Sequence, residues 1–492
     1  MVIARGLLGI QTTLVKNMQH MVFSLTEAGA RLFVTRFFRQ FISIGCVTIL
    51  EGDTIFIFGE NESTCPLKSI LKIHSPQFYW KVMTLADLGL ADAYINGDFS
   101  FVDKDSGLLN LIMILIANRD LNSRKSNLAK KRGWWTPVFL TASLASATYY
   151  LKHSNEFFGL FMDDTMMYSS AVFKVTIKNF QNEKNTSFNR KGEDKEEPYE
   201  VLEIGCGWGT LAIEVVKRTG CKYTGFTLSI EQLKYVEEKV KEAGLQERIT
   251  FKLCDYRQLC DTQKYDRIIS CEMIEHVGHK FMETFFSHCE AALAEDGIFV
   301  LQFTAIPEEL YDESRLTSGF ITEYIFPGGC LPSLARVTSA MASSSRLCIE
   351  NVENIGIHYY PTLRYWRKNL LERQKQIIDL GFDEKFLRTW EYYFDYCAAG
   401  FKTLTLRNYQ IVFSRPGNVA AFGNDDPFHS SALTQEMGLI LQTGNVSSNV
   451  VFSVCFPLSF IICKRLPRHL KQFCFHDYAF CSNNLSLSRP YI

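Results

Sequence analysis

The segment Tyr199-Glu-Val-Leu-Glu-Ile-Gly-Cys-Gly-Trp-Gly209 joins a short apolar run to three glycines at alternate positions. Residues 200–204 indicate a buried strand, and residues 210–218 have the apolar spacing of a helix that ends at Gly220. Because glycine has no side chain, a ligand can come close to the backbone of such a turn. The helix N-terminus then offers free N–H groups to a carboxylate. We therefore expect a ligand site where this strand ends.

The spacing of Gly205, Gly207 and Gly209 differs from the Gly-x-Gly-x-x-Gly pattern typical of dinucleotide sites. An NAD site also has an acidic residue about 20 positions farther on for the ribose, and residues 221–230 contain none. Glu203 lies near the strand end, where its carboxylate can hold a ligand's ammonium group or order the loop. A plain tight turn is the alternative interpretation. The pattern favours an S-adenosylmethionine site over a nicotinamide site.

The composition limits the class of protein. A chain of 492 residues with 47% hydrophobic residues can fill more than one core. The 52 basic and 53 acidic side chains leave a net charge of −1, so the overall charge does not favour nucleic acid as a partner. The 15 Cys include no Cys-x-x-Cys pair, and no apolar run reaches the roughly 20 residues of a membrane-spanning helix. We expect reduced thiols, no metal site and a cytoplasmic protein.

Strand-like runs alternate with helical ones in the second half of the chain, at 200–204, 221–226, 249–253, 265–270 and 297–303. This alternation predicts an α/β, Rossmann-like methyltransferase fold with a mostly parallel sheet. A small α+β domain precedes it. We expect four parts: the α+β domain at 30–120, a basic linker at 121–153, the methyltransferase domain at 154–421 with a polar insert at 181–198, and an atypical, disordered tail at 422–492.

The linker places five basic residues beside two tryptophans between Arg124 and Trp135. Basic side chains and tryptophan both suit an anionic lipid surface. A solvated linker whose tryptophans pack on the next domain is the alternative. The patch predicts peripheral association with a membrane.

Two further strand ends carry polar residues. Thr227 and Gln232 follow the second strand, where they either reach a ligand's ribose and carboxylate or, for Gln232, belong to a helix capping box with Ser229. Asp255 and Tyr256 end the third strand, where an adenine would lie, because strand-end carboxylates in such sheets face the ligand crevice. We include all four among the cofactor-binding residues.

The fourth strand runs into the loop Glu272-Met-Ile-Glu275-His-Val-Gly-His279. Its two carboxylates and two histidines fit no standard zinc spacing. A carboxylate beside a sulfonium is the preferred interpretation of this loop.

These motifs carry a resemblance. Leu-Glu-Ile-Gly-Cys-Gly-Trp-Gly209, Phe-Thr-Leu-Ser229, Glu275-His-Val-Gly-His279, Ile325-Phe-Pro-Gly-Gly329 and His358-Tyr359 resemble the cyclopropane-fatty-acid synthase family, which includes the mycolic acid cyclopropane synthases. The resemblance covers roughly residues 31–421, and the plant form is the most similar. It implies transfer of a methylene from S-adenosylmethionine to the cis double bond of an unsaturated phospholipid acyl chain. The partners would be that lipid, a membrane surface and, as a further option, a second copy of the chain.

The resemblance also implies how the site works. Family members hold a bicarbonate ion as the base that closes the ring. The matching positions here are Glu275, Tyr359, Gln302 in place of a histidine, and Ser170 in place of a cysteine. Tyr168 and Ser169 match residues that close over the cofactor. Without the resemblance, Tyr359 is equally a packed aromatic residue beside Tyr360.

Two departures leave alternatives open. A family segment that carries a cofactor-lid helix has no counterpart directly before Ser154, and the polar run 181–198 replaces an amphipathic helix. An inactive lipid-binding remnant is therefore one alternative. A coclaurine-type N-methyltransferase acting on a small amine is the other.

Overall fold

The computed structural model describes residues 26–60, 65–125, 155–171, 198–259 and 263–418. The chain forms two compact units. The first comprises Met1–Phe161, Glu309–Cys330 and Tyr360–Leu406, and the second comprises Met162–Glu308, Leu331–Tyr359 and Arg407–Ile492. The predicted insert up to residue 197, the linker beyond residue 125 and the tail lie outside the described residues.

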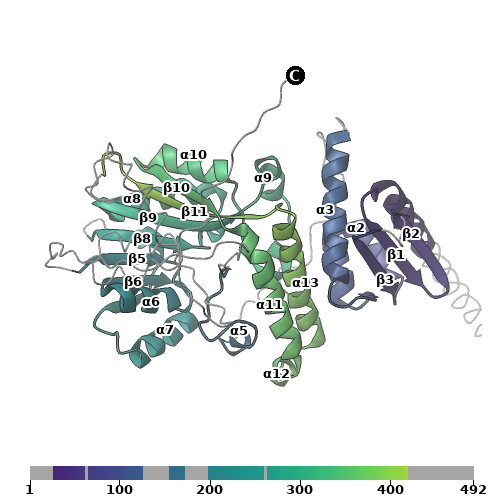
Figure 1. Ribbon diagram of the computed structural model, residues 1–492, viewed down its shortest axis with the longest axis horizontal. Coiled ribbons are helices and arrows are strands. Elements are labelled where there is room, and N and C mark those ends of the chain that lie inside the picture. Colours follow the sequence, from purple (N-terminus) through teal and green to yellow (C-terminus); the bar gives the residue numbers. More distant parts are fainter. Residues whose placement is uncertain (1–25, 61–64, 126–154, 172–197, 260–262, 419–492) are drawn as a thin grey trace, which may run out of the picture. The chain divides into compact units, whose positions relative to one another are not determined.

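The second unit contains a seven-stranded sheet in the order β10-β11-β9-β8-β5-β6-β7 (Figure 1). Neighbouring strands are parallel except β11, which is antiparallel to both β9 and β10. The five runs predicted as strands are confirmed as β5 to β9, whereas the sequence pattern does not predict β10 and β11. The strands are β5 Glu200–Ile204, β6 Lys222–Thr227, β7 Ile249–Leu253, β8 Tyr265–Cys271, β9 Leu293–Ala305, β10 Cys348–Asn354 and β11 Arg407–Ser414.

Apolar side chains alternate along these strands and form two cores, one on each face of the sheet. Val201 and Val300 belong to the core under α6 and α7, and their neighbours Leu202 and Phe299 belong to the core under α8 and α10. Figure 1 shows α6 and α7 near β6, α8 near β9 and α10 near β10. Helices thus cover both faces of the sheet. The four helices are α6 Thr210–Thr219, α7 Ile230–Glu242, α8 Met282–Ala292 and α10 Leu334–Ser344.

The strand order reverses between β5 and β8, because β6 and β7 continue on one side of this pair and β9 on the other. Ligands of open α/β sheets bind at the carboxyl ends of strands at such a switch point. Here the turn that starts at Gly205 and the loop that starts at Glu272 leave the sheet side by side, since Ile204 pairs with Ser270. The Ser270 hydroxyl also donates to the Ile204 carbonyl oxygen at 3.1 Å.

The first unit contains a four-stranded sheet in the order β2-β1-β3-β4. β1 and β2 form an antiparallel pair, and β3 is parallel to β1. Residues 26–41 are helical. The other elements are β1 Cys46–Glu51, β2 Thr54–Gly59, β3 Lys68–Ile73, α2 Gln77–Ile95, β4 Phe99–Phe101 and α3 Gly107–Lys125.

Two later segments of the chain belong to this first unit, so the compact units do not follow the predicted boundaries. They supply α9 Glu308–Ser314, η5 Ile321–Ile325, α11 Tyr359–Glu372, α12 Gln374–Asp379 and α13 Glu384–Lys402. Apolar and aromatic burial explains this, because α13 packs on α2 and α3. Trp390 of α13 also packs on Phe157 and Phe161 of α5 (Asn155–Phe161), at centroid distances of 5.0 and 5.4 Å.

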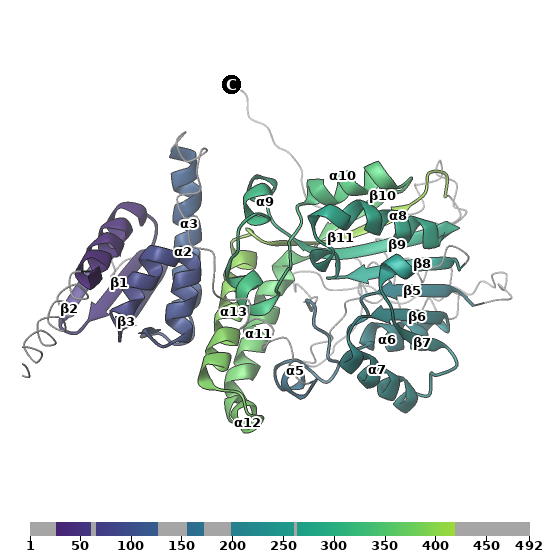
Figure 2. The same cartoon turned by 180° about the vertical axis from the view of Figure 1, so that it is seen from behind.

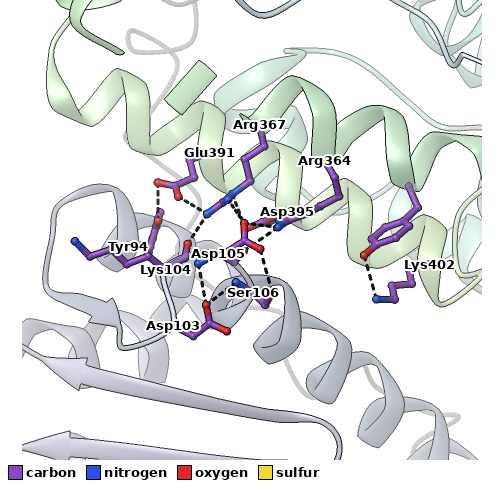
Figure 3. Close-up of polar contacts among 11 residues, drawn as sticks. Tyr94, Asp103, Lys104, Asp105, Ser106, Arg364, Arg367, Glu391, Asp395 and Lys402 are labelled. Atoms are coloured by element: carbon purple, nitrogen blue, oxygen red, sulfur yellow. Dashed lines mark hydrogen bonds and ion pairs between the residues drawn. The ribbon is translucent and has the colours of Figure 1, made fainter. Parts of the chain in front are cut away.

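A buried network of charges also joins these segments. Arg367 of α11 is 3% exposed and pairs with Glu391 and Asp395 of α13 and with Asp105, at 2.6 to 3.1 Å (Figure 3). Arg364, one turn earlier, pairs with Asp105 and Asp395 as well. Burial raises the pKa of the Asp395 carboxyl to about 6, while the two guanidinium groups act in the opposite direction. Both views of the chain show α11 and α13 side by side (Figure 1 and Figure 2).

We expect Arg367→Met to weaken the packing of α11 on α13 strongly. The substitution leaves the buried carboxylates of Glu391 and Asp395 with too little positive charge, which costs about 3 kcal/mol. Peptides covering both helices should therefore lose roughly 100-fold in hydrogen-exchange protection, measured by mass spectrometry. Lys368→Met is the control, since the Lys368–Glu372 pair is exposed and spans 3.7 Å. Equal protection in the two variants would contradict the importance of the network.

Candidate active site

The glycine turn after β5 has the backbone conformation that the sequence predicts. Gly205, Gly207 and Gly209 all have positive φ, at 86°, 51° and 75°. A Cβ at Gly205 or Gly209 would lie 2.8 Å from a side-chain carbon, of Met273 and Val236 respectively. A Cβ at Gly207 would have no atom of the described residues within 4 Å. The turn therefore packs tightly at two glycines and is open at the third. This opening fits a ligand that lies against the backbone, as the predicted S-adenosylmethionine site requires.

Glu203, on β5, is 3% exposed. Its Oε2 accepts a hydrogen bond of 3.0 Å from the Tyr223 hydroxyl of β6. Burial raises the pKa of the Glu203 carboxyl to about 8, because one phenol hydrogen bond offsets little of the cost of a buried charge. The side chain is thus neutral at pH 7 in the protein without ligand.

Thr227 and Gln232 lie together at the next strand end. The Thr227 hydroxyl donates to Gln232 Oε1 at 2.9 Å, and the Ser229 hydroxyl accepts from the Gln232 backbone N–H at 3.2 Å. Ser229 is therefore the N-cap of α7, which confirms the capping prediction for Ser229. The Gln232 side chain faces Thr227, so the pair forms one polar edge after β6.

Asp255 and Tyr256 follow β7, as predicted, and both already have protein partners. Asp255 is tied to Arg257 by an ion pair of 2.5 Å, and this partner lowers the pKa of the Asp255 carboxyl. Its side chain also caps the short helix η2 (Tyr256–Gln258). Tyr256 packs its ring against Phe285 of α8, at a centroid distance of 5.3 Å. These contacts fix Tyr256 at the sheet edge as an apolar wall.

A group of polar contacts surrounds Glu272, which follows β8. Four donors converge on its carboxylate: Gln302 Nε2 at 2.8 Å, the Tyr359 hydroxyl at 2.9 Å, Asn408 Nδ2 at 2.6 Å and the Thr304 hydroxyl at 2.9 Å. Gln302 and Thr304 lie on β9 and Asn408 lies on β11. Three of these hydrogen bonds end on Oε1 and one on Oε2, so the strands and the loop together hold the Glu272 carboxylate in place.

Glu275 lies beside this group, in the short helix η3 (Ile274–His276). Its Oε1 accepts from the Thr304 backbone N–H at 2.6 Å, while its Oε2 is buried and has no hydrogen-bond partner within the described part of the chain. Burial raises the pKa of the Glu275 carboxyl well above its ordinary value, and the nearby Glu272 carboxylate raises it further. Burial and the neighbouring carboxylate thus both favour the neutral form of Glu275.

The predicted residues Tyr168, Ser169 and Ser170 lie in three different environments. Ser169 is 3% exposed, and its hydroxyl accepts from Gln302 Nε2 at 2.8 Å, so it joins the Glu272 group. Ser170 donates instead to the carbonyl oxygen of Ala171 at 3.0 Å. Tyr168 lies against Trp208 of the glycine turn, with ring centroids 6.5 Å apart. The structure thus brings Glu275, Gln302, Tyr359 and Ser169 together, and places Tyr168 by the turn.

The sequence motifs indicate Glu272 only as one of the two carboxylates of its loop, and they do not indicate Thr304, Asn408 or Gln410. A signal for these three residues does exist, because Gln302 and Thr304, and likewise Asn408 and Gln410, are polar residues at alternate positions of a strand. Gln410 pairs with Gln302 in the sheet, and Asn408 pairs with Thr304. Gln410 Nε2 also donates to Gln302 Oε1 at 2.6 Å, which orients the Gln302 amide toward Glu272.

A mostly parallel seven-stranded sheet with a glycine turn at the switch point defines the class of protein: an S-adenosylmethionine-dependent methyltransferase of Rossmann-like fold. Residues 141–411 match the family described as mycolic acid cyclopropane synthetase, which is more than half of the 492 residues. The chain belongs to this family. Its resemblance to the plant form in particular stays a prediction.

Named relatives agree with this assignment. The tuberculostearic acid methyltransferase UfaA1 of Mycobacterium tuberculosis is 36% identical over 273 residues, which are 54% of this chain and 63% of that protein. The cyclopropane-fatty-acyl-phospholipid synthase of Escherichia coli K12 is 31% identical over 358 residues, which are 70% of this chain and 87% of that protein. The chain thus spans less than two thirds of the first relative and most of the second.

Solved structures give weaker likenesses. The cyclopropane synthase MmaA2 from Mycobacterium tuberculosis has a TM-score of 0.47 at 23% identity. The superposition covers 56% of this chain and 99% of the MmaA2 chain. Coclaurine N-methyltransferase has a TM-score of 0.47 at 16% identity, and the superposition covers 66% of this chain and 99% of that chain. Because both TM-scores lie below 0.5, the family assignment rests on the sequence relatives and the family match.

Gly207→Ala should weaken cofactor binding about tenfold or more, because the added methyl group enters the open side of the turn. Isothermal titration with S-adenosylmethionine measures this. Gly244→Ala is the matched control, since Gly244 also has a positive φ, 67°, with no atom within 4 Å of its Cβ. Both variants carry the same backbone strain of about 1 kcal/mol, and only the first should lose affinity. Equal affinities would place the ligand elsewhere.

The raised pKa of Glu203 predicts a pH dependence of stability without ligand. Between pH 4.5 and about 8 the folded protein holds a proton on Glu203 that the unfolded chain has lost. The free energy of unfolding should therefore fall as pH rises through this window, by a few kcal/mol in order of magnitude. Urea unfolding at several pH values, wild type minus Glu203→Gln, isolates this contribution. A difference that is constant from pH 5 to pH 8 would contradict the neutral carboxyl.

Proposed function

We propose that this chain transfers a methylene group from S-adenosylmethionine to the cis double bond of a phospholipid acyl chain and so forms a cyclopropane ring. Membership of the family supports methyl transfer to lipid acyl chains. The observation that carries the finer proposal is the carboxylate pair Glu272 and Glu275 at the switch point of the sheet. One negative charge held at this place suits a reaction in which positive charge develops on carbon.

The cofactor, when bound, supplies an electrophilic methyl group on a sulfonium. Residues of the chain would form the cofactor-binding site. Gly207 leaves the backbone of the turn accessible to the cofactor, and Thr227 and Gln232 offer hydroxyl and amide groups after β6. Tyr256 gives an apolar wall where the third parallel strand ends. Glu203 and Tyr168 lie at β5 and its glycine turn, as a cofactor across the carboxyl ends of β5, β6 and β7 would require. The cofactor roles of Asp255 and Ser169 stay predictions, because Asp255 pairs with Arg257 and Ser169 accepts from Gln302.

An alkene is a weak nucleophile, so its reaction with a methyl donor leaves a carbocation that water would capture. The site must therefore exclude water and hold negative charge close to the reacting carbons. Glu275, Gln302 and Tyr359 are 7%, 4% and 7% exposed. Their burial keeps the surroundings of the Glu272 carboxylate poor in water, and the Tyr359 ring adds a π face toward a cation.

The resemblance predicts bicarbonate as the base that removes the last proton. The donors that would hold it, Tyr359 and Gln302, already donate to Glu272, and the hydroxyl of Ser170 donates to Ala171. The residues as arranged do not fit a further anion. Bicarbonate therefore stays a prediction.

We also propose that the protein acts at a membrane surface, as a peripheral protein on the cytoplasmic side. Within the described residues, no helix combines the length and the apolar character that crossing a bilayer would demand. The support is the row of basic residues with Trp134 and Trp135, which suits anionic headgroups. A homodimer stays a prediction, as does the effect of the family segment that has no counterpart before Ser154.

The function is tested by incubating the full chain with labelled S-adenosylmethionine and vesicles that contain a mono-unsaturated, anionic phospholipid. Mass spectrometry should find saturated acyl chains that are one CH₂ heavier and carry the label. Glu275→Ala should lower the yield about tenfold or more, because it removes a buried group of the carboxylate pair. Glu242→Ala, an exposed glutamate of α7, should leave it unchanged.

The alternatives predict other outcomes of the same experiment. Label that appears in soluble amines and not in lipid would favour the N-methyltransferase. Bound cofactor without any labelled product would remove the synthase proposal, and failure to bind cofactor would favour the inactive remnant. A further variant replaces the five basic linker residues. If it loses product on anionic vesicles but keeps its activity on detergent-dispersed lipid, the result would support action at a membrane surface.

A further inference from the structure

We propose that the Glu272 carboxylate is the built-in base of this chain and occupies the place of a free anion such as bicarbonate. The inference rests on the proposed function and names the group that accepts the proton. The geometry supports it, because four hydrogen-bond donors converge at the sheet edge and all four donate to a protein carboxylate. The anion of the site is thus a side chain of the protein and not a bound ion.

A second anion has neither donors nor a favourable charge here. Gln302 donates both amide hydrogens, one to Glu272 and one to Ser169, and its amide oxygen accepts from Gln410. The Tyr359 hydroxyl has one proton, which it gives to Glu272. A bicarbonate would have to displace Glu272 and would add its charge beside two carboxyl groups, and like charges this close disfavour one another.

The backbone of Glu272 is a separate observation that points to a role. Its φ is 53°, in the left-handed region where residues with a Cβ are rare. Holding a side chain there costs of the order of 1 kcal/mol or more, and such strain persists where surrounding contacts enforce it, commonly at functional sites. Glycine would adopt this conformation without cost. The chain instead places a carboxylate at this position and aims it at the donors of β9 and β11.

The chemistry needs only a weak base. One alkene carbon forms a bond to the methyl carbon while the sulfur–methyl bond breaks and leaves its electron pair on sulfur. Glu272 then takes a proton from the new methyl group, and the released C–H electron pair closes the ring onto the cationic carbon. The products are the cyclopropane, a neutral thioether and a protonated Glu272, which returns its proton to solvent.

The four hydrogen bonds also suit the Glu272 carboxylate to accept a proton without attacking the cofactor. They disperse its charge, so it is a poor nucleophile toward a sulfonium, yet a proton next to a carbocation is acidic enough to be taken by it. Burial and the Glu272 carboxylate both favour the neutral form of Glu275, which limits like-charge repulsion beside Glu272. Glu272 is also half-buried, whereas Glu275 is buried, so Glu272 is the more accessible of the two to an acyl chain.

The test begins with binding, in the full chain without cofactor. We compare wild type with Glu272→Gly, which fits the left-handed backbone and releases the four donors. Titration of ¹³C-labelled bicarbonate, followed by the line width of its NMR signal, should show no binding to wild type and binding to the variant. In buffer freed of carbon dioxide, wild type should keep its rate of ring formation. The variant should lose about 100-fold and recover with added bicarbonate.

Opposite results overturn the inference. Bicarbonate binding to wild type, together with loss of its activity when carbon dioxide is removed, would make the free anion the base. Glu272→Gln keeps the size of the side chain and removes its basicity, so an unchanged rate in this variant would also exclude Glu272. If no lipid product forms under any condition, the proposed function fails, while the bicarbonate titration still decides whether Glu272 occupies the anion site.

Discussion

The pairing register of β11 with β9 is the constraint on which the rest of the site depends. Asn408 lies opposite Thr304 and Gln410 opposite Gln302, so four polar side chains leave the same face of the sheet at its edge. A shift of one residue would turn this row to the other face, which is filled by Ile411 and Phe413. Burial of the apolar alternate residues therefore fixes where the hydrogen-bond donors meet the Glu272 carboxylate.

The parts of the fold that local sequence pattern encodes could be predicted. The strand and glycine turn around Gly205 depend on neighbouring residues only, and so does the cap that Ser229 provides for α7. The five parallel strands follow from apolar runs because strands buried on both faces are nearly continuous in apolar residues. For the same reason Glu203, a carboxylate within such a run, could be recognised as unusual.

The site around Glu272 could be predicted only in part, because it is assembled from distant segments. The resemblance supplied Glu275, Gln302 and Tyr359, but β11 lies more than a hundred residues after β9 and its pairing is not visible in a local pattern. The compact units could not be predicted either. The amphipathic pattern of α13 predicts a helix with one buried face and does not reveal that α2 and α3 cover this face.

The strand order has a consequence for how the protein is made. β10 is synthesised well before β11, yet β11 is its pairing partner in the sheet and stands between it and β9. During translation, the edge of the sheet that contains β10 must wait for residues 407–414 to leave the ribosome. The carboxylate at Glu272 meanwhile lacks its Asn408 donor, so this edge of the sheet is completed only after residues 407–414 have been synthesised.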